Sequence, residues 1–133
     1  MGTGTVSVLL DTPAAVWLVQ GNPRLGDAAR EKLTHLDRKD IYVSDLLLLE
    51  LSMLISKGRV TVDTDPKAFL RDFALRFRVL SIDGEIAATA MDLPLTHGDP
   101  FDRVFVATAL RHQLPLVTRD RTIRDSGIVD VIW

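Results

Sequence analysis

Short apolar runs alternate with longer stretches of mixed polar and apolar residues along almost the whole chain. The apolar runs are predicted to be β-strands, at residues 6–10, 41–43, 79–81, 114–118 and 129–133. Ser7 alone interrupts the first run, a pattern typical of a parallel strand that is buried on both faces. Because helical stretches separate these strands, we expect an α/β fold with three layers, in which helices cover both faces of a central, mostly parallel sheet.

The stretches between the strands are expected to be helices, at residues 14–20, 26–37, 45–57, 66–77, 83–91, 100–113 and 121–124. Pro13 and Pro100 stand in first turns, where proline is favoured, and Gly58 follows the third helix. Thr12 is the expected N-cap of the first helix, because it precedes the proline. This assignment leaves Asp11, which follows the first strand, without a structural role.

The stretch from Asp99 to Arg103 opens the sixth predicted helix. Asp99 stands at the N-cap, Pro100 at the first helical position and Asp102 at the third. This is the spacing of an acidic capping box, in which both carboxylates satisfy backbone amides and favour the positive end of the helix dipole. Capping alone therefore explains this pair as well as a functional role does.

Glu50 has no comparable local explanation. It lies in a leucine-rich helix that is apolar nearly all round, and such a helix is expected to be buried. An ionised carboxylate in an apolar site is costly unless it is paired, hydrogen-bonded or bound to a metal. The positions three and four residues away carry no charge, since they hold Leu46, Leu47, Met53 and Leu54. A partner must come from elsewhere; alternatively, the side chain reaches the helix edge or pairs with a distant arginine.

Asp11 and Asp120 each come directly after a predicted strand. The carboxyl ends of parallel strands meet at one edge of a sheet, and ligand sites lie there at the topological switch point. Asp102 and Glu50 begin or line helices that can face the same crevice, so four acids from four distant segments would meet. Their mutual repulsion would raise some of their pKa values unless a divalent cation were bound.

The available ligand types select among cations. The chain has no cysteine, and its three histidines, His35, His97 and His112, are scattered, so the acids offer a set of oxygen ligands. Such a set favours Mg²⁺ or Mn²⁺ over zinc. Magnesium keeps several waters and contacts phosphate groups, which makes metal-assisted phosphoryl chemistry the leading hypothesis.

Composition narrows the class of protein further. A chain of 133 residues is long enough for one domain, and 47% hydrophobic with only 6% aromatic residues suits an aliphatic α/β core. The net charge of −2 gives no overall basic footprint, so nucleic-acid contacts would depend on local patches or bound cations. The lack of cysteine excludes disulfides and thiolate catalysis. With neither a signal-peptide pattern nor an apolar run near the ~20 residues of a membrane span, we expect a soluble, cytoplasmic protein.

Several motifs together resemble one protein family. They are Asp11-Thr12 after the first strand, Glu50-Leu51 in the leucine-rich helix, the stretch 99–103, and the stretch 114–120. The ordered set is similar to PIN-domain ribonucleases and, more narrowly, to the VapC toxins of bacterial toxin–antitoxin pairs. The resemblance spans nearly the whole chain and implies a single PIN-like nuclease domain over residues 1–133.

The resemblance implies a metal-dependent endoribonuclease, the toxin of a type II toxin–antitoxin pair, in which Mg²⁺ or Mn²⁺ activates a water that cuts RNA. The family's acidic quartet corresponds here to Asp11, Glu50, Asp102 and Asp120. Asp11 and Asp102 are expected to bind the metal directly, and the other two directly or through waters. An RNA substrate, a small antitoxin and a homodimer are the implied partners.

The resemblance also implies supporting residues, namely the hydroxyls of Thr12 and Thr118 and, for neutralising phosphate, Arg103 or Arg119. Asp99 is assigned to capping. Leu47 departs from the family pattern, because relatives often have a small or hydroxyl residue one turn before the glutamate. This difference leaves the acids in place and puts the approach to the site in doubt.

Two other functions stay open at this point. An inactive PIN scaffold that only binds a partner is compatible with the fold, although the complete quartet argues against it. A phospho-acceptor receiver domain is also a small parallel α/β fold with clustered acids and Mg²⁺. Receiver domains place a lysine after a late strand, whereas the lysines of this chain all lie in its N-terminal half, at Lys32, Lys39, Lys57 and Lys67.

Overall fold

The computed structural model of the protein describes residues 6–96 and 98–133; residues 1–5 and His97, one of the scattered histidines, lie outside the described part. Five short strands form one sheet in the order β3-β2-β1-β4-β5, and each neighbouring pair is parallel. The predicted parallel sheet is thus confirmed, although its first, fourth and fifth strands are shorter than the apolar runs that predicted them. They are β1 (Val8–Leu10), β2 (Ile41–Ser44), β3 (Arg78–Leu80), β4 (Leu116–Val117) and β5 (Val131–Ile132).

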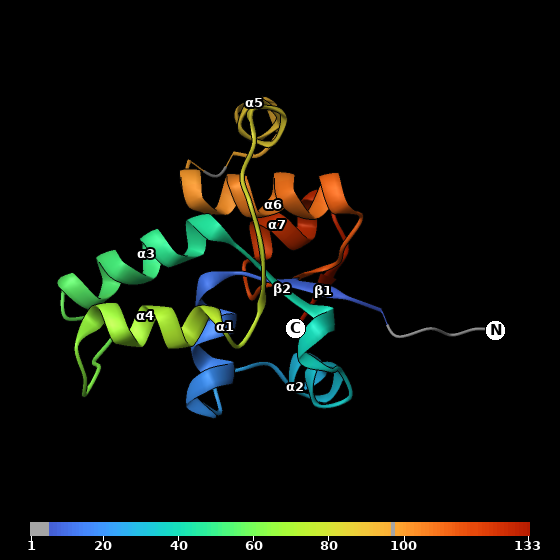
Figure 1. Ribbon diagram of the computed structural model, residues 1–133. Helices are drawn as coiled ribbons and strands as arrows, with labels where there is room; N and C mark the ends of the chain where they lie inside the picture. Colours follow the sequence, from blue (N-terminus) through green and yellow to red (C-terminus); the bar gives the residue numbers. More distant parts are fainter. Residues whose placement is uncertain (1–5, 97) are drawn as a thin grey trace.

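Each connection between successive strands contains at least one helix. Figure 1 shows α6 and α7 on one side of the sheet and α1 and α2 on the other, with α5 stacked outside α6. Helices α3 and α4 pack together at the left of this view. The helices are α1 (Thr12–Gln20), α2 (Asp27–Thr34), α3 (Asp45–Ser56), α4 (Pro66–Ala74), α5 (Gly84–Asp92), α6 (Pro100–His112) and α7 (Arg121–Ser126), with a short 3₁₀ helix at Arg38–Asp40.

β1 lies at the centre of the sheet and forms the middle of the core. All three of its residues have 0% exposure, as the first apolar run predicts. The strand pairs with β2 on one side and with β4 on the other. Helix α6 lies against it and buries the stretch 104–109.

The strand order places the topological switch point between β1 and β4. The chain proceeds outward from β1 to β2 and β3, and then returns to form β4 and β5 on the other side. A hydrogen bond of 3.1 Å from the Asp11 amide to the Val117 carbonyl joins the chain just after β1 to the end of β4. The carboxyl ends of these two strands therefore open at the same edge of the sheet.

The N-cap of helix α1 lies one residue earlier than predicted. Its N-cap is Asp11, whose Oδ1 accepts a hydrogen bond of 2.9 Å from the Ala14 amide, and Thr12 is the first helical residue. The prediction that Thr12 caps this helix was wrong, and so was the inference that Asp11 lacks a structural role. Proline in the first turn marks where a helix starts, but it does not fix which of the two preceding residues is the cap.

Helix α3 is less buried than its composition predicts. Leu47 and Leu51 are buried, whereas Leu49 is 55% exposed and Met53 is 39% exposed. The prediction of a helix buried all round was wrong, because only one face of α3 packs against the core while another remains an apolar surface. No helix in the described part of the chain is both long and apolar enough to cross a bilayer.

Candidate active site

Five carboxylates line one cavity of about 450 Å³ at the edge where β1 and β4 end, which we call the acidic cavity. The structure thus brings together the four acids of the predicted quartet and adds a fifth. Their catalytic roles stay predictions. The five are Asp11 before α1, Glu50 within α3, Asp99 and Asp102 at the start of α6, and Asp120 before α7.

Three of these aspartates cap the helices that they precede. Oδ1 of Asp11 accepts from the Ala14 amide, Oδ1 of Asp99 accepts from the Phe101 amide at 2.9 Å, and Oδ1 of Asp120 accepts from the Ile123 amide at 3.0 Å. Capping positions suit carboxylates because the N-terminal end of a helix carries partial positive charge. Since capping uses one oxygen of each carboxylate, it does not by itself exclude a role in binding a cation.

Asp11 is the most deeply buried of the five carboxylates, with 4% exposure. Its pKa is raised to about 6, mainly by burial and to a smaller extent by the neighbouring charges of Glu50 and Asp120. Hydrogen bonds from the Thr118 side chain and the Ala14 amide act in the opposite direction and do not offset the burial. A carboxylate in this setting would be stabilised in its ionised form by a nearby cation.

Glu50 finds its partner on a different helix. The Thr12 hydroxyl donates a hydrogen bond of 2.5 Å to Oε1 of Glu50, so the first residue of α1 is joined to the middle of α3. Burial raises the pKa of Glu50, the Thr12 hydrogen bond lowers it, and the charge of Asp99 raises it. No residue within the same helix could pair with Glu50, and its partner is instead a hydroxyl group on another helix.

Thr118 connects two of the acids. Its hydroxyl is almost fully buried, accepts a hydrogen bond of 3.1 Å from the Asp120 amide and lies within hydrogen-bonding reach of the Asp11 carboxylate. A hydroxyl group can donate and accept at the same time, so both contacts are compatible. The residue after β4 therefore helps to position the acids that follow β1 and β4.

The two arginines considered for phosphate have different surroundings. Arg119 lines the acidic cavity, whereas Arg103 is not among the residues that line it. The Arg103 guanidinium instead donates to four backbone carbonyls at the end of α5 and in the loop that follows, those of Ala90, Met91, Leu93 and Leu95, at 2.7–3.2 Å. These bonds give Arg103 a structural task, and the phosphate role is better suited to Arg119.

The fit of the cavity to a metal rests on its donor atoms. The five carboxylates supply oxygen ligands of the kind that Mg²⁺ and Mn²⁺ prefer, and the raised pKa of Asp11 shows that negative charge is costly there. Among the described residues, no three Asp, Glu or His side chains are already arranged as a group that could hold a metal ion. The cavity therefore fits a hard cation by chemistry and charge, and not by a preformed set of ligands.

Asp99 is the residue whose place in the cavity the sequence analysis missed. Capping was a sufficient explanation for it, and the structure confirms the cap. The available signal was its spacing from Asp102, because two acids in the first turn of one helix face the same end of that helix. Asp99 both caps α6 and lines the acidic cavity.

Comparison with known proteins places this arrangement in context. A family model described as the PIN domain matches residues 8–128. Ribonuclease VapC22 of Mycobacterium tuberculosis (strain ATCC 25618 / H37Rv) is 35% identical over 119 residues, which cover 89% of this chain and 90% of that protein.

Solved structures with the same fold are more distant in sequence. A toxin–antitoxin complex from Klebsiella pneumoniae is similar with a TM-score of 0.69 at 22% identity, and covers 96% of this chain and 97% of the other. A DNA-bound VapBC from Salmonella typhimurium gives a TM-score of 0.71 at 20% identity, with coverage of 95% and 96%. At these identities the two structures show a shared fold.

Proposed function

This chain belongs to the PIN-domain family and to its VapC group, and from that membership we propose that it is a metal-dependent endoribonuclease, the toxin of a type II toxin–antitoxin pair. The observation that carries the proposal is the acidic cavity, in which the four acids of the predicted quartet surround one space at the switch point of the sheet. The buried Asp11, whose pKa is raised, supports a cation at this position.

Asp11 and Asp102 are proposed to bind Mg²⁺ or Mn²⁺ directly, and Glu50 and Asp120 to bind it directly or through waters. When bound, such a cation supplies a water of lowered pKa and stabilises negative charge that develops on the phosphate. The carboxylates hold their positions through the helices that they cap or occupy.

The remaining residues of the site orient these groups. Thr12 fixes one oxygen of Glu50, and Thr118 contacts Asp11 while it accepts from the Asp120 amide. Arg119 lies on the wall of the cavity, where its guanidinium can pair with a phosphate oxygen of the substrate. In the proposed hydrolysis the water oxygen bonds to phosphorus and the P–O bond to the leaving nucleotide breaks, while the proton released by the water ends on the leaving oxygen.

The proposed partners are an RNA substrate and a small antitoxin protein. Support for the antitoxin comes from the VapC relationship and from the toxin–antitoxin complex of Klebsiella pneumoniae that shares the fold. A homodimer is proposed as well, because Leu49 and Met53 leave an apolar surface on α3. Dimerisation through this apolar surface would not require the carboxylates of the acidic cavity.

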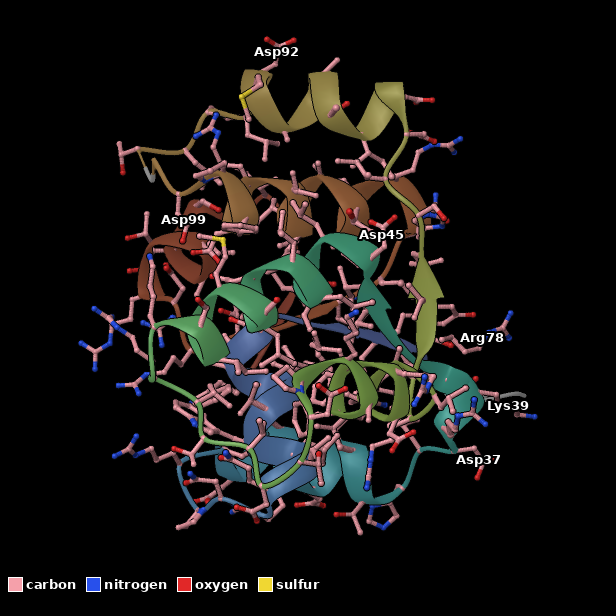
Figure 2. The ribbon with its side chains drawn as sticks, turned by 60° about the vertical axis from the view of Figure 1, so that its left-hand side comes forward. Asp37, Lys39, Asp45, Arg78, Asp92 and Asp99 are labelled. Atoms are coloured by element: carbon pink, nitrogen blue, oxygen red, sulfur yellow. The ribbon has the colours of Figure 1, made fainter. Side chains whose placement is uncertain are left out.

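The test is cleavage of a mixed structured RNA by purified protein with Mg²⁺ or Mn²⁺, beside EDTA and an Asp102→Asn variant. We expect cutting that requires the metal and is lost in Asp102→Asn. Asp92→Asn is the matched control, because Asp92 is exposed at the end of α5 and points outward at the top of Figure 2. This control should cut as the wild type does.

Two results would contradict the proposal. Equal cutting by the wild type and by Asp102→Asn would assign the activity to a contaminant. A wild type that neither cuts RNA nor binds Mn²⁺ would favour the inactive scaffold, whose role is to bind a partner.

A further inference from the structure

A second cavity of about 540 Å³ adjoins the acidic cavity, and arginines dominate its lining. The two cavities share the wall formed by the stretch 118–121. Beyond this wall, the second cavity is lined by Arg24 from the loop between α1 and α2, by Arg124 from α7 and by Trp133. Together with Arg119 and Arg121 of the shared wall, these residues define what we call the arginine cavity.

The positive charge of this cavity is only partly compensated. One carboxylate, that of Asp120 on the shared wall, lines it beside the four arginines. Arg124 pairs with its neighbour Asp125 at 3.2 Å, but both side chains are more than half exposed, so the pair is weak. Within residues 6–96 and 98–133, the guanidinium groups of Arg24 and Arg121 make no hydrogen bond or ion pair. Four guanidinium groups and one carboxylate around one space leave a net positive potential that favours a polyanion. The chain as a whole has a net charge of −2, so this is a local property.

An aromatic surface borders the same cavity. The Arg119 guanidinium lies over the ring of Trp17 at 5.6 Å, and this ring in turn packs against Trp133 at 5.9 Å between centroids. The carbonyl of Trp133 accepts from the Ala29 amide at 3.0 Å, and a Cβ at Gly26 would lie only 2.1 Å from that carbonyl oxygen. The absence of a side chain at Gly26 therefore lets Trp133 sit against α2, beside the arginines.

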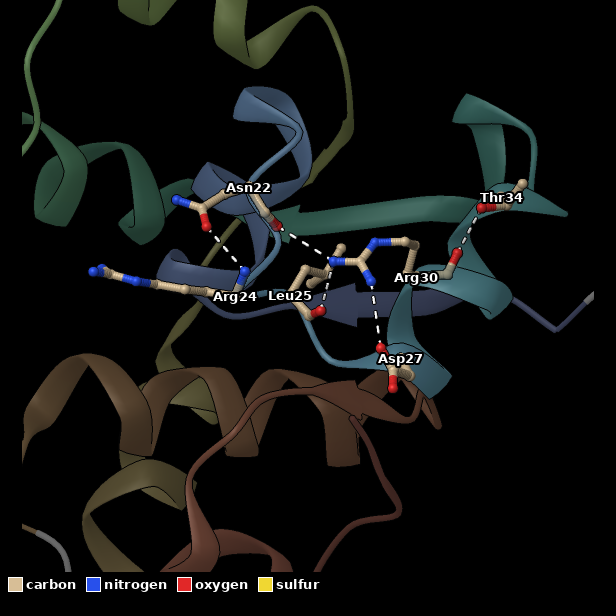
Figure 3. Close-up of polar contacts among 6 residues, drawn as sticks. All are labelled: Asn22, Arg24, Leu25, Asp27, Arg30 and Thr34. Carbon is tan, nitrogen blue, oxygen red and sulfur yellow. Dashed lines mark hydrogen bonds and ion pairs between the residues drawn. The ribbon is translucent and has the colours of Figure 1, made fainter.

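The loop that carries Arg24 is braced by its own hydrogen bonds. The Arg24 amide donates to Oδ1 of Asn22 at 2.9 Å, and the Arg30 guanidinium donates to the carbonyl of Leu25 at 2.8 Å. Figure 3 shows that the Arg24 side chain points away from these contacts. A fixed backbone thus presents a guanidinium that takes no part in holding the loop together.

We propose that the arginine cavity binds the nucleotides of a single-stranded RNA next to the phosphate that is cut, with backbone phosphates on the arginines and a base against Trp133. The inference rests on the proposed ribonuclease function, because a strand with one phosphate in the acidic cavity must continue past the shared wall. Arginine and aromatic side chains together are the usual means of holding single strands, whose bases are free to stack. An acidic peptide would use the charge but has no need of the ring.

The test measures binding of a fluorescein-labelled 12-nucleotide single-stranded RNA in EDTA, where cleavage cannot interfere. The variant is Arg24→Gln with Arg124→Gln, because neither residue lines the acidic cavity and both are exposed. We expect affinity to fall about tenfold or more, and the slope of log K against log salt to decrease by about 1.4, which corresponds to two lost phosphate contacts on a single strand.

Arg38→Gln with Arg78→Gln is the matched control. Both arginines are exposed and line a separate hollow with Asp37 and Lys39. Arg78 also lies over an aromatic ring, that of Tyr42, at 5.3 Å. Figure 2 shows Asp37, Lys39 and Arg78 on the right of the molecule, and Asp99 of the acidic cavity on the left. Removing two charges there should change affinity by less than about twofold.

Tryptophan fluorescence provides a second measurement. The chain has two tryptophans, Trp17 and Trp133, and they are in contact with each other beside the arginine cavity. Single-stranded RNA should quench their emission in the wild type and in the Arg38/Arg78 control. A duplex of the same sequence should quench much less, because its bases are already stacked.

Three outcomes would overturn the inference. They are unchanged RNA affinity in the Arg24/Arg124 variant, no quenching by RNA in the wild type, and tighter binding with stronger quenching by a polyglutamate peptide than by RNA. The last result would assign the cavity to a protein partner. Binding in EDTA is measured separately from cleavage. If only the proposed catalytic function fails, cleavage is absent and the binding pattern is unchanged; if only this inference fails, the binding pattern is lost and cleavage remains.

Discussion

Asp11 combines two properties that oppose each other in the absence of a cation. As the N-cap of α1 it accepts from a backbone amide at the positive end of the helix, which favours its ionised form. Its burial disfavours that form more strongly, so its pKa rises from the usual 3.8 to about 6. Ionised Asp11 therefore reduces the stability of the metal-free fold.

This balance predicts how Asp11→Asn changes stability with pH in EDTA. The folded protein keeps the Asp11 proton up to about pH 6, while the unfolded chain releases it near pH 3.8, so ionisation of Asp11 lowers the free energy of unfolding as pH rises through this window. Asparagine keeps the cap without the charge. The variant should match the wild type near pH 4 and exceed it by up to about 3 kcal/mol at pH 7.5, as measured by urea unfolding.

Asp83→Asn is the control for this experiment. Asp83 caps α5 through a 2.8 Å bond from the Ile86 amide, but it is exposed. The same substitution at an exposed cap should give no advantage that grows with pH. A difference between Asp11→Asn and the wild type that is the same at pH 4 and pH 7.5 would contradict the prediction.

At the scale of elements, Arg103 holds the end of α5 to the start of α6. The last carbonyls of a helix have no partner within the helix, and the Arg103 guanidinium satisfies two in α5, those of Ala90 and Met91. It then bonds the carbonyls of Leu93 and Leu95 in the following loop. Because the same turn of α6 carries Asp102, this clamp also fixes one wall of the acidic cavity.

Arg103→Met should therefore destabilise the protein while retaining the apolar part of the side chain. Loss of four charge-assisted hydrogen bonds to partly buried carbonyls should lower the free energy of unfolding by about 2–4 kcal/mol. The control is Arg111→Met on the same helix, whose exposed ion pair with Glu85 at 3.4 Å also joins α6 to α5. That change should cost less than about 1 kcal/mol. Equal losses in the two variants, measured by urea unfolding, would contradict the role assigned to Arg103.

Most of the fold could be predicted from local patterns. The helix from Pro100 was expected to end at 113, and it ends at His112. The prediction was close because an N-cap, a first-turn proline and an apolar face all indicate a helix over this stretch. The central strand was recognised from its apolar run, which only Ser7 interrupts. The errors lie where local rules do not decide. Exposure of Leu49 on α3 depends on which neighbours cover that helix, and no pattern within the helix states this.

The site was predictable as a set of acids and not as a set of contacts. The strand ends indicated Asp11 and Asp120, because the parallel sheet brings such ends together. The hydroxyl contact from Thr12 to Glu50 joins residues 38 positions apart, and only the packing of α1 on α3 creates it. The arginine cavity likewise combines Arg24 with residues near the end of the sequence, so no local motif could reveal it.

At the scale of the whole molecule, the strand order sets negative and positive surfaces side by side. Placing β4 next to β1 brings the acids that follow both strands into one cavity, and the stretch 118–121 separates it from the arginine cavity. The net charge of −2 for the whole chain does not indicate that its negative and positive side chains are separated in this way. An RNA strand would pass from arginines to a cation-bound centre across a single wall.

A cation bound in the acidic cavity would join helices α1, α3, α6 and α7, so it should stabilise the whole fold. We expect Mn²⁺ to raise the melting temperature by several degrees at pH 7.5, since ligand at a hundred times its dissociation constant adds about 2.7 kcal/mol. The shift should shrink at pH 5, where Asp11 holds a proton that the metal must displace. Asp102→Asn should lose most of the shift and Asp92→Asn should keep it. A shift of the same size at both pH values and in both variants would place the metal outside the acidic cavity.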